Sequence, residues 1–282
     1  CVADGINDPD NFTSNVANAS VQGRAGGNRN LSNEVADAWT VGFVLRPRWV
    51  EDLTVAIDWV EFDIEDSIEQ FTLQQVMESC YDDASFPNSF CSQFTREADG
   101  QLPAVNAFTT GFVNAGKKTF RGLTVDSEYS LDLADVDWIR NMMPSVGKLR
   151  TSAFLFFPRE DLTIVGTSID DDQGEPGNSD VQAQLNFQYL HGPWRSLLQS
   201  RYIGKATINN NDVATSRDVR ELDAVWLFNA GVSYQVTSKV GVQMNINNLF
   251  DDTPEAAAIA SGNDGVYDNI GRYVRLGLRA EF

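Results

Sequence analysis

The stretch WLFNAGVSYQV, residues 226–236, decides the fold class, because apolar and polar side chains alternate along it. One set of positions holds Trp226, Phe228, Ala230, Val232, Tyr234 and Val236, and the other holds Asn229, Gly231, Ser233 and Gln235. Successive side chains of a β-strand point to opposite faces, so this period of two predicts a strand with one apolar and one polar face. The stretches at 181–189, 240–247 and 274–282 repeat the pattern.

Nine strands are predicted when the alternation is followed outward along the chain. They cover about 36–46, 52–67, 117–133, 147–165, 180–190, 195–207, 224–236, 240–250 and 269–282. Within 53–66 the apolar positions change phase, which predicts a β-bulge near Trp59–Val60. Such a bulge would place Asp58, Glu61, Asp63 and Glu65 on one face.

The connections between these strands alternate in length. Short ones lie at Pro47–Glu51, His191–Trp194 and Thr237–Lys239, and long ones lie at 68–116, 166–179, 208–223 and 251–268. The connection 134–146 is intermediate, although its place in the order puts it with the short ones. Short turns at one rim and long loops at the other are typical of a transmembrane β-barrel of the outer-membrane type.

Aromatic side chains near the ends of the predicted strands fit the same class. They would form the girdles at the two membrane interfaces, and they are Trp59, Tyr189, Trp194, Trp226, Phe250, Tyr273 and Phe282. The alternative is a large soluble β-sandwich whose core contains these rings. A sandwich gives no reason for the separation of short and long connections.

The composition excludes several functions. The 282 residues include 40 Asp+Glu against 21 Lys+Arg, and the net charge of −19 argues against binding nucleic acid or an anionic lipid surface. The 17 Phe, 7 Tyr and 6 Trp argue against disorder. No stretch approaches the roughly 18 apolar residues of a membrane helix. An acidic secreted β-protein and an outer-membrane barrel remain.

The three cysteines are Cys1, Cys80 and Cys91. Cys80 and Cys91 lie close together in a polar, irregular stretch, where a local disulfide would suit an oxidising compartment. Three reduced thiols are the alternative. Cys1 would lack a partner unless the chain continues upstream, and a lipid-modified Cys1 is a further reading. Bacterial single-chain barrels have an even number of strands, so the odd count also leads us to expect that the N-terminal part is missing.

Four segments resemble motifs of the TonB-dependent outer-membrane receptors. The C-terminal YDNIGRYVRLGLRAEF, residues 267–282, is similar to that family's closing strand in its Gly-Arg pair, its alternation and its terminal aromatic residue. The segment NNLFDDTPE at 247–255 resembles the turn out of the penultimate strand. NLSNE at 30–34 and VNAGKKTFRGL at 113–123 resemble two strand starts. The four motifs occur in the family's order across nearly the whole chain.

The resemblance implies an all-β fold, with about nine C-terminal strands of a 22-stranded antiparallel transmembrane β-barrel and with the plug domain absent. It implies that residues 1–35 end an extracellular loop and that 36–282 form barrel with a long outer loop at 68–116. Members of the family transport a scarce or bulky ligand, such as a ferric siderophore or an oligosaccharide, across the outer membrane of a Gram-negative bacterium. The implied partners are membrane lipid and lipopolysaccharide, the chain's own plug, TonB through the missing N-terminal part, and the small-molecule ligand.

Candidate site residues follow from this scheme. The lumen-facing side chains predicted to contact the plug are Gln182, Gln184, Asn186, Arg275 and Arg279. Long loops commonly carry function, and aromatic and Arg side chains dominate recognition surfaces. The ligand-contact candidates in 68–116 are therefore Phe86, Phe90, Phe94 and Arg96. A structural cover is the alternative for this loop.

Enzyme chemistry has little support. The lone His191 lies in HGPW, which is typical of a turn, and the chain has no Gly-x-Ser-x-Gly or phosphate-binding glycine motif. The acidic run 170–175 departs from an EF-hand because Gly174 stands where a ligand is needed, so we expect a solvated loop tip there and a turn at Asn209–Asp212. No catalytic residue, metal or cofactor is predicted. A secreted glycan-binding or glycan-cleaving protein and a passive porin are the alternative functions.

Overall fold

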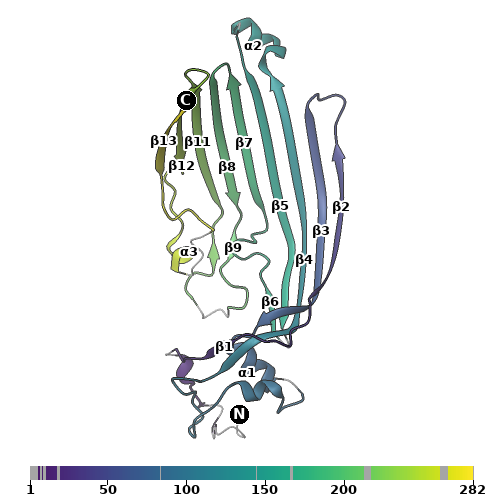
Figure 1. Ribbon diagram of the computed structural model, residues 1–282, viewed down its shortest axis with the longest axis vertical. Helices are drawn as coiled ribbons and strands as arrows, with labels where there is room; N and C mark the ends of the chain where they lie inside the picture. The colour runs from purple at the N-terminus through teal and green to yellow at the C-terminus, as the bar shows by residue number, and fades with distance from the viewer. Residues whose placement is uncertain are drawn as a thin grey trace. The chain divides into compact units, whose positions relative to one another are not determined.

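The computed structural model describes residues 6, 8, 11–17, 20–82, 84–143, 145–165, 168–212, 217–260 and 266–281. Its main sheet has the strand order β13-β12-β11-β8-β7-β5-β4-β3-β2, in which chain neighbours are also neighbours in the sheet (Figure 1). These strands are β2 (Val35–Leu45), β3 (Leu53–Gln70), β4 (Thr109–Asp132), β5 (Lys148–Val165), β7 (Gln182–His191), β8 (Trp194–Ile203), β11 (Val225–Gln235), β12 (Val240–Asn247) and β13 (Tyr273–Ala280). The predicted all-β class is confirmed, and the described residues show no pairing between β2 and β13.

Shorter elements lie in the connections. They are β1 (Arg24–Gly26), β6 (Ser168–Asp171), β9 (Ala206–Thr207), β10 (Glu221–Leu222), the helices α1 (Leu73–Tyr81), α2 (Asp137–Met142) and α3 (Ala256–Ala260), and the 3-10 turns η3 (Asn15–Ala17), η4 (Ser89–Gln93) and η5 (Leu133–Asp135). The connection expected at 68–116 comprises 71–108, because β3 and β4 extend farther than their alternation indicates. None of the described helices is both long enough and apolar enough to cross a membrane.

The chain divides into two compact units. The loop unit comprises Cys1–Asp37, Phe62–Thr119 and Leu162–Asp171, and the wall unit comprises Ala38–Glu61, Phe120–Asp161 and Asp172–Phe282. The loop unit has its own core around Phe71, Val76 and Leu102. Cys1, the cysteine for which we expected an upstream partner, lies outside the described residues.

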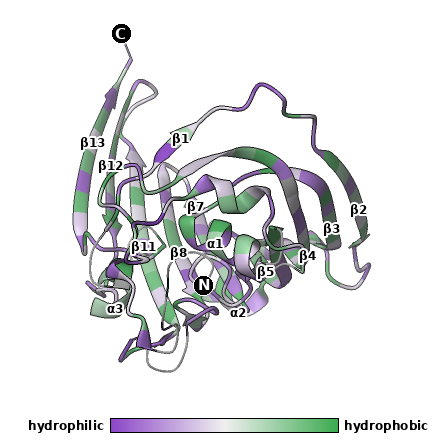
Figure 2. Cartoon of the chain, turned by 90° about the horizontal axis from the view of Figure 1, so that it is seen from below, coloured by the Kyte–Doolittle hydropathy of each residue, from purple (hydrophilic) through white to green (hydrophobic). Residues whose placement is uncertain are grey.

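The strand registers show that the wall has one apolar and one polar face. In the β11–β12 pair, Val232 lies opposite Met244, and the neighbouring Ser233 lies opposite Gln243. In the β12–β13 pair, Leu276 lies opposite Met244. Residues directly opposite share a face of a sheet, so the alternation read from single strands continues across β5, β7, β8, β11, β12 and β13. Figure 2 shows hydrophobic and hydrophilic residues alternating along β13.

Two aromatic groups lie at opposite ends of the apolar face. One contains Trp226 beside Tyr202, with ring centroids 4.8 Å apart, and the other contains Trp194 beside Tyr234 at 4.5 Å. Trp226 and Tyr234 are eight residues apart on β11, or about 26 Å along the strand at roughly 3.3 Å per residue. A strand tilt of about 40° reduces this to about 20 Å in height, close to the apolar band of about 25 Å that barrels present to a membrane.

Tyr273 does not belong to either aromatic group, so its predicted place in a girdle is wrong. It lies opposite Asn247 on the polar face, and the Arg275 guanidinium lies 4.9 Å from its ring centroid. The physical reason is parity, because Tyr273 and Arg275 are two residues apart and point to the same side.

The bulge predicted near Trp59–Val60 is also wrong. Trp59 Nε1 donates to Glu61 Oε2 at 3.5 Å, so these two side chains share one face of an uninterrupted strand. Asp58, next to Trp59, therefore lies on the face opposite Glu61. The change of apolar phase marks a change of surroundings instead, since β3 passes from the wall unit into the loop unit after Glu61.

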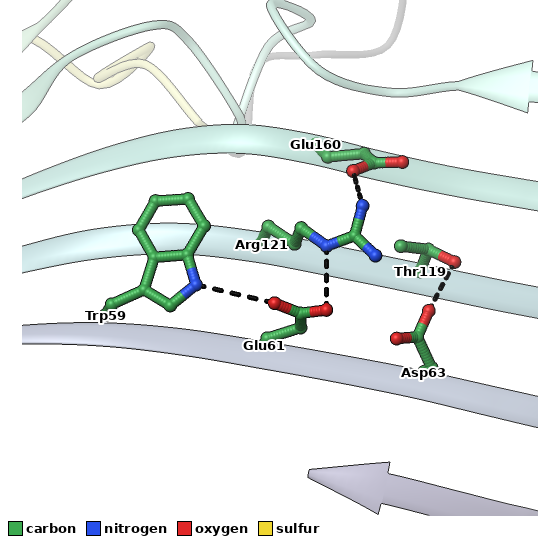
Figure 3. A network of polar contacts seen from close by, with 6 residues as sticks. All are labelled: Trp59, Glu61, Asp63, Thr119, Arg121 and Glu160. Carbon is green, nitrogen blue, oxygen red and sulfur yellow. Dashed lines mark hydrogen bonds and ion pairs between the residues drawn. The ribbon is translucent and has the colours of Figure 1, made fainter. Parts of the chain in front are cut away.

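A change of phase does occur in β5. Phe120 stacks on Phe156 with centroids 6.1 Å apart, whereas the adjacent Arg121 forms an ion pair with Glu160 (Figure 3). Phe120 and Arg121 point to opposite faces of β4, so Phe156 and Glu160 reach opposite faces although they are four positions apart, which in a regular strand would put them on the same face. Pro158 lies between them, where β7 pairing has ended at Phe156, and proline within a sheet is confined to such interruptions.

Candidate functional site

The polar face of the wall carries six cationic side chains. Its register-paired segments on β5, β7, β8, β11, β12 and β13 contain no Asp or Glu, although the chain has 40 acidic against 21 basic residues. The cations are Lys148, Arg150, Arg195, Arg201, Arg275 and Arg279, and the registers place every one on the polar face. This part of the wall therefore presents positive charge to anything that faces it.

Acidic side chains begin where the polar face passes to β4 and β3. A hollow of about 710 Å³ brings Asp52 and Glu128 together with Arg150. Lys148 Nζ lies 3.4 Å from Asp132 Oδ2 across the β4–β5 boundary. The polar face thus has a cationic part over β5, β7, β8, β11, β12 and β13 and an acidic part over β3 and β4, and the two parts meet at β5.

A ladder of amide side chains crosses the middle of the cationic part. Asn229 Nδ2 donates to Gln199 Oε1 at 3.0 Å, and Gln199 Nε2 donates to Asn186 Oδ1 at 3.0 Å. Asn186 Nδ2 then donates to Ser152 Oγ at 3.1 Å, and the backbone N–H of Asn248 donates to Asn229 Oδ1 at 2.9 Å. Each amide donates in one direction and accepts from the other, so neighbouring bonds polarise one another.

A second hollow lies on the polar face near the short turns. It measures about 780 Å³ and contains Arg195 and Arg279 beside Gly241 and Gly277. A Cβ on Gly277 would lie 2.9 Å from the Gln243 side chain. Because these glycines have no side chain, the space between the two guanidinium groups stays open. The guanidinium groups can donate bidentate hydrogen bonds to carboxylate or phosphate oxygens.

All five side chains predicted to contact the plug lie on the polar face. Gln182 Nε2 donates to the Gly177 carbonyl at 2.6 Å, and Gln184 lies opposite Arg201. Asn186 belongs to the ladder, Arg275 covers Tyr273, and Arg279 forms an ion pair with Glu281. Their contact with a plug stays a prediction.

Other polar-face residues were not predicted from the sequence, namely Arg150, Arg195, Gln199 and Arg201. They lie on β5 and β8, whose alternation is weaker. Leu197 and Phe154 occupy polar-face positions there. Counting every second residue from Gln199 would have found the arginines of β8.

Two connections fold onto the polar face at the end away from the short turns. Ile203 and Leu227 occupy polar-face positions, yet both are buried against Leu222, Ala258 and Tyr267. An apolar cluster at this end therefore holds Leu222 of the connection before β11, and Ala258 and Tyr267 of the connection after β12, against the strands.

Tyr267 is buried in this cluster, and its hydroxyl has no hydrogen-bond partner among the described residues. Burial raises the pKa of Tyr267 above its usual value, and the negative charge of Glu255 adds to the rise. Both effects disfavour the phenolate.

The ligand-contact candidates of the loop unit have different surroundings. Phe94 is 7% exposed, and Phe90 packs on Phe71 with ring centroids 4.9 Å apart. The structure thus gives these two rings a core role. Phe86 is 39% exposed and stacks on Tyr81 at 5.8 Å.

Arg96 is held from several sides. Its guanidinium carbon lies 5.6 Å from the ring centroids of both Tyr81 and Phe94. Its Nε donates to Tyr81 Oη at 2.9 Å, and its Nη1 donates to the Gly100 carbonyl at 2.7 Å. Arg96 therefore orders this loop, and Phe86 is the candidate whose ring remains most available to a ligand.

A disulfide joins Cys80 at the end of α1 to Cys91 in η4, as the oxidising alternative predicted. The helix α1 starts with a capping box, in which Thr72 accepts from the Gln75 N–H and the Gln75 side chain accepts from the Thr72 N–H. Capping and the disulfide fix both ends of this nine-residue helix.

The acidic run at 170–175 and the asparagine run at 209–212 are joined by hydrogen bonds. Asn210 N–H donates to Glu175 Oε1 at 2.6 Å, and Asn210 Nδ2 donates to the Gln173 carbonyl at 2.8 Å. Among the described residues, no group of three or more His, Cys, Asp or Glu side chains is arranged to bind a metal ion.

His191, the single histidine of the chain, stacks on Tyr189 and lies opposite Trp194.

Comparison with known proteins gives a consistent result. The family model "TonB dependent receptor-like, beta-barrel" matches residues 4–249. A mutant of the ferric enterobactin receptor PfeA from Pseudomonas aeruginosa, in complex with enterobactin, is similar with a TM-score of 0.59 and 15% identity, over 93% of this chain and 34% of that chain. The outer membrane transporter YddB from Escherichia coli gives 0.54 and 13%, over 94% and 35%. The chain spans about a third of these proteins, and no curated protein matches it in sequence.

Proposed function

The chain belongs to the TonB-dependent receptor-like β-barrel family, and on that premise we propose that it forms part of the wall of an active transporter in the outer membrane of a Gram-negative bacterium. The transporter would take up a scarce or bulky ligand without covalent chemistry. The observation that carries the proposal is the two-faced wall. One face is apolar between two aromatic groups, and the other carries amides and cations.

The polar face suits contact with a removable polar body. Amides and guanidinium groups can hold a plug by many hydrogen bonds of about 1 kcal/mol each. Release of the plug would then not require the exposure of a buried apolar core. The side chains proposed for this role are Gln182, Gln184, Asn186, Arg275 and Arg279. The resemblance to the family implies that TonB acts on the plug.

The ligand we propose is an anionic chelate, such as a ferric siderophore. The net charge of −19 alone points away from such a ligand. The cationic part of the polar face reverses that argument locally, because exposed charges interact mainly within about one Debye length, 8–10 Å. An oligosaccharide is the second candidate, favoured by the amide ladder. Phe86 and Arg96 stay predictions for ligand contact.

Uptake in living cells tests the proposal. Cells expressing the protein should accumulate radiolabelled iron supplied as ferric enterobactin, and a proton uncoupler should abolish the accumulation. Accumulation that resists the uncoupler would indicate a porin, and recovery of the protein in the detergent-free soluble fraction would indicate a secreted protein. Uptake of labelled maltodextrin but not of the chelate would favour the oligosaccharide.

A matched pair of variants tests the polar face itself. Arg201→Gln removes a cation from the polar face, whereas Lys239→Gln removes one from a short turn. We expect the first to reduce uptake of the anionic chelate and the second to leave it unchanged. Joint exchange of the five plug candidates for alanine should reduce plug retention, and unchanged retention would contradict their assignment.

A further inference from the structure

Helix α2 presents an apolar surface that nothing in the described structure covers. Trp138 and Met142 are 66% and 73% exposed, and Met143, directly after the helix, is 59% exposed. Trp138 and Met142 are four residues apart, so they lie on one side of the helix. Three large apolar side chains gathered on one short turn are unusual for a surface that faces only water.

The polar side chains of α2 are used within the connection itself. Arg140 Nη2 lies 2.5 Å from Asp137 Oδ1, and Arg140 Nη1 donates to the Ala134 carbonyl at 3.4 Å. These contacts tie the other side of the helix to η5. The side that carries Trp138 and Met142 is therefore left to face the surroundings.

The position of α2 along the strands places it at the edge of the apolar face. The connection 133–147 ends at β5, whose first apolar-face residue, Leu149, lies opposite Tyr189. Two residues farther along β7, His191 lies opposite Trp194 of the aromatic group at this end. Figure 1 shows α2 at the same end of the sheet as the turn between β2 and β3, which carries Trp49 at 86% exposure. The apolar side of α2 thus continues the apolar face at the level of its aromatic border.

We propose that α2 is an interfacial anchor, in which Trp138, Met142 and Met143 insert into the headgroup region of the phospholipid leaflet at the short-turn rim. The inference rests on the membrane location proposed above and goes beyond transport. Trp is enriched at this depth because its ring is apolar and its N–H can bond to water or phosphate. Insertion is driven by apolar burial, so it needs no anionic lipid.

A second protein is the competing occupant, and the structure favours lipid for two reasons. The exposed residues continue a face that already ends in an aromatic border, and that face is the one expected to contact the bilayer. The surface is also short, since α2 has six residues, and none of the four described hollows is lined by a residue of α2.

Site-directed spin labelling tests the anchor in the intact protein. In a Cys1→Ser background, Met142→Cys carries the label on the apolar side, and Asp137→Cys carries it on the opposite side, where the Asp137 side chain is 82% exposed. Leu198→Cys, on the apolar face of β8 opposite Phe187, reports lipid. The protein is placed in phosphatidylcholine vesicles, and the collision rates of the label with oxygen and with a neutral nickel chelate are compared.

The expected result is an oxygen-to-nickel ratio at 142 several-fold above that at 137 and close to that at 198. Equal, water-like ratios at 142 and 137, with a lipid-like ratio at 198, would overturn the anchor and leave the proposed function intact. Protection of position 142 from both reagents would overturn it in favour of a protein contact. A water-like ratio at 198 would overturn the membrane wall and the anchor together.

Discussion

Replacing Gln199 with leucine tests whether the amide ladder stabilises the wall. Gln199 donates to Asn186 and accepts from Asn229, both at 3.0 Å, so Gln199→Leu removes two hydrogen bonds. At about 1 kcal/mol each, the free energy of unfolding should fall by about 2 kcal/mol. The two partners are only half-buried, so water can bond to them and the larger cost of an unpaired buried group is avoided.

The control is Gln243→Leu, the same exchange on the same polar face. Gln243 makes no side-chain hydrogen bond among the described residues, so the change in stability should stay within about 0.5 kcal/mol. The assay is guanidinium unfolding of the purified protein in lipid vesicles, followed by tryptophan emission, with an unchanged denaturant slope required for comparison.

A double-mutant cycle between Gln199 and Asn229 makes the test specific. If the ladder bond is real, Gln199→Leu and Asn229→Leu together should cost about 1 kcal/mol less than the sum of the single losses. Additive losses, or an equal loss in Gln243→Leu, would refute the idea that the amides act as a connected ladder. They would then be independent hydrated side chains.

Three further outcomes are expected. Replacing Cys80 and Cys91 with serine should destabilise the loop unit by about 3 kcal/mol, the loop-closure entropy of a ring of this size. The measurement is the rate of trypsin cleavage within 71–108, which should rise while the wall stays folded. The pKa of Tyr267 is raised in the folded protein, so near pH 10 the unfolded chain releases the phenol proton while the folded protein retains it. The free energy of unfolding should therefore fall as the pH rises through 10. Tyr267→Phe should remove part of that fall and leave the stability at neutral pH unchanged. Gly147→Ala should destabilise by about 1–3 kcal/mol in the same unfolding assay, because its Cβ would lie 1.9 Å from the Leu190 carbonyl oxygen.

Most of the wall could be predicted from the sequence because its period of two is a local property. Strand β12 alternates without exception, and β11 departs from the pattern at Val225 and Leu227; the registers confirm the faces that single strands indicate. Prediction failed where side chains respond to distant neighbours. The phase change at Pro158 depends on where the β7 partner ends, and β3 changes surroundings at the border of two units.

The candidate site was predicted less completely for the same physical reason. The sequence indicates that Phe90 and Phe94 are aromatic residues in a long loop. Their burial depends on Phe71, which precedes the disulfide in the chain, and on Tyr81, which directly follows Cys80. The arginines of β8 were missed because Leu197 interrupts the polar positions. Helix α2 gave no signal, since six residues are too few for a helical period to be recognised.

The charge of the whole chain is a poor guide to the field at its wall. Forty acidic against 21 basic residues give a net charge of −19. Yet no acidic residue lies in the segments by which β5, β7, β8, β11, β12 and β13 pair with one another, where every charged side chain is a cation on one face. Interactions between exposed charges fade beyond about 8–10 Å in physiological salt. A body in contact with these strands therefore experiences the field of their arginines more strongly than that of acidic side chains beyond this distance. Uptake of an anionic ligand should consequently depend more steeply on Arg201 than on any change of equal charge in the connections.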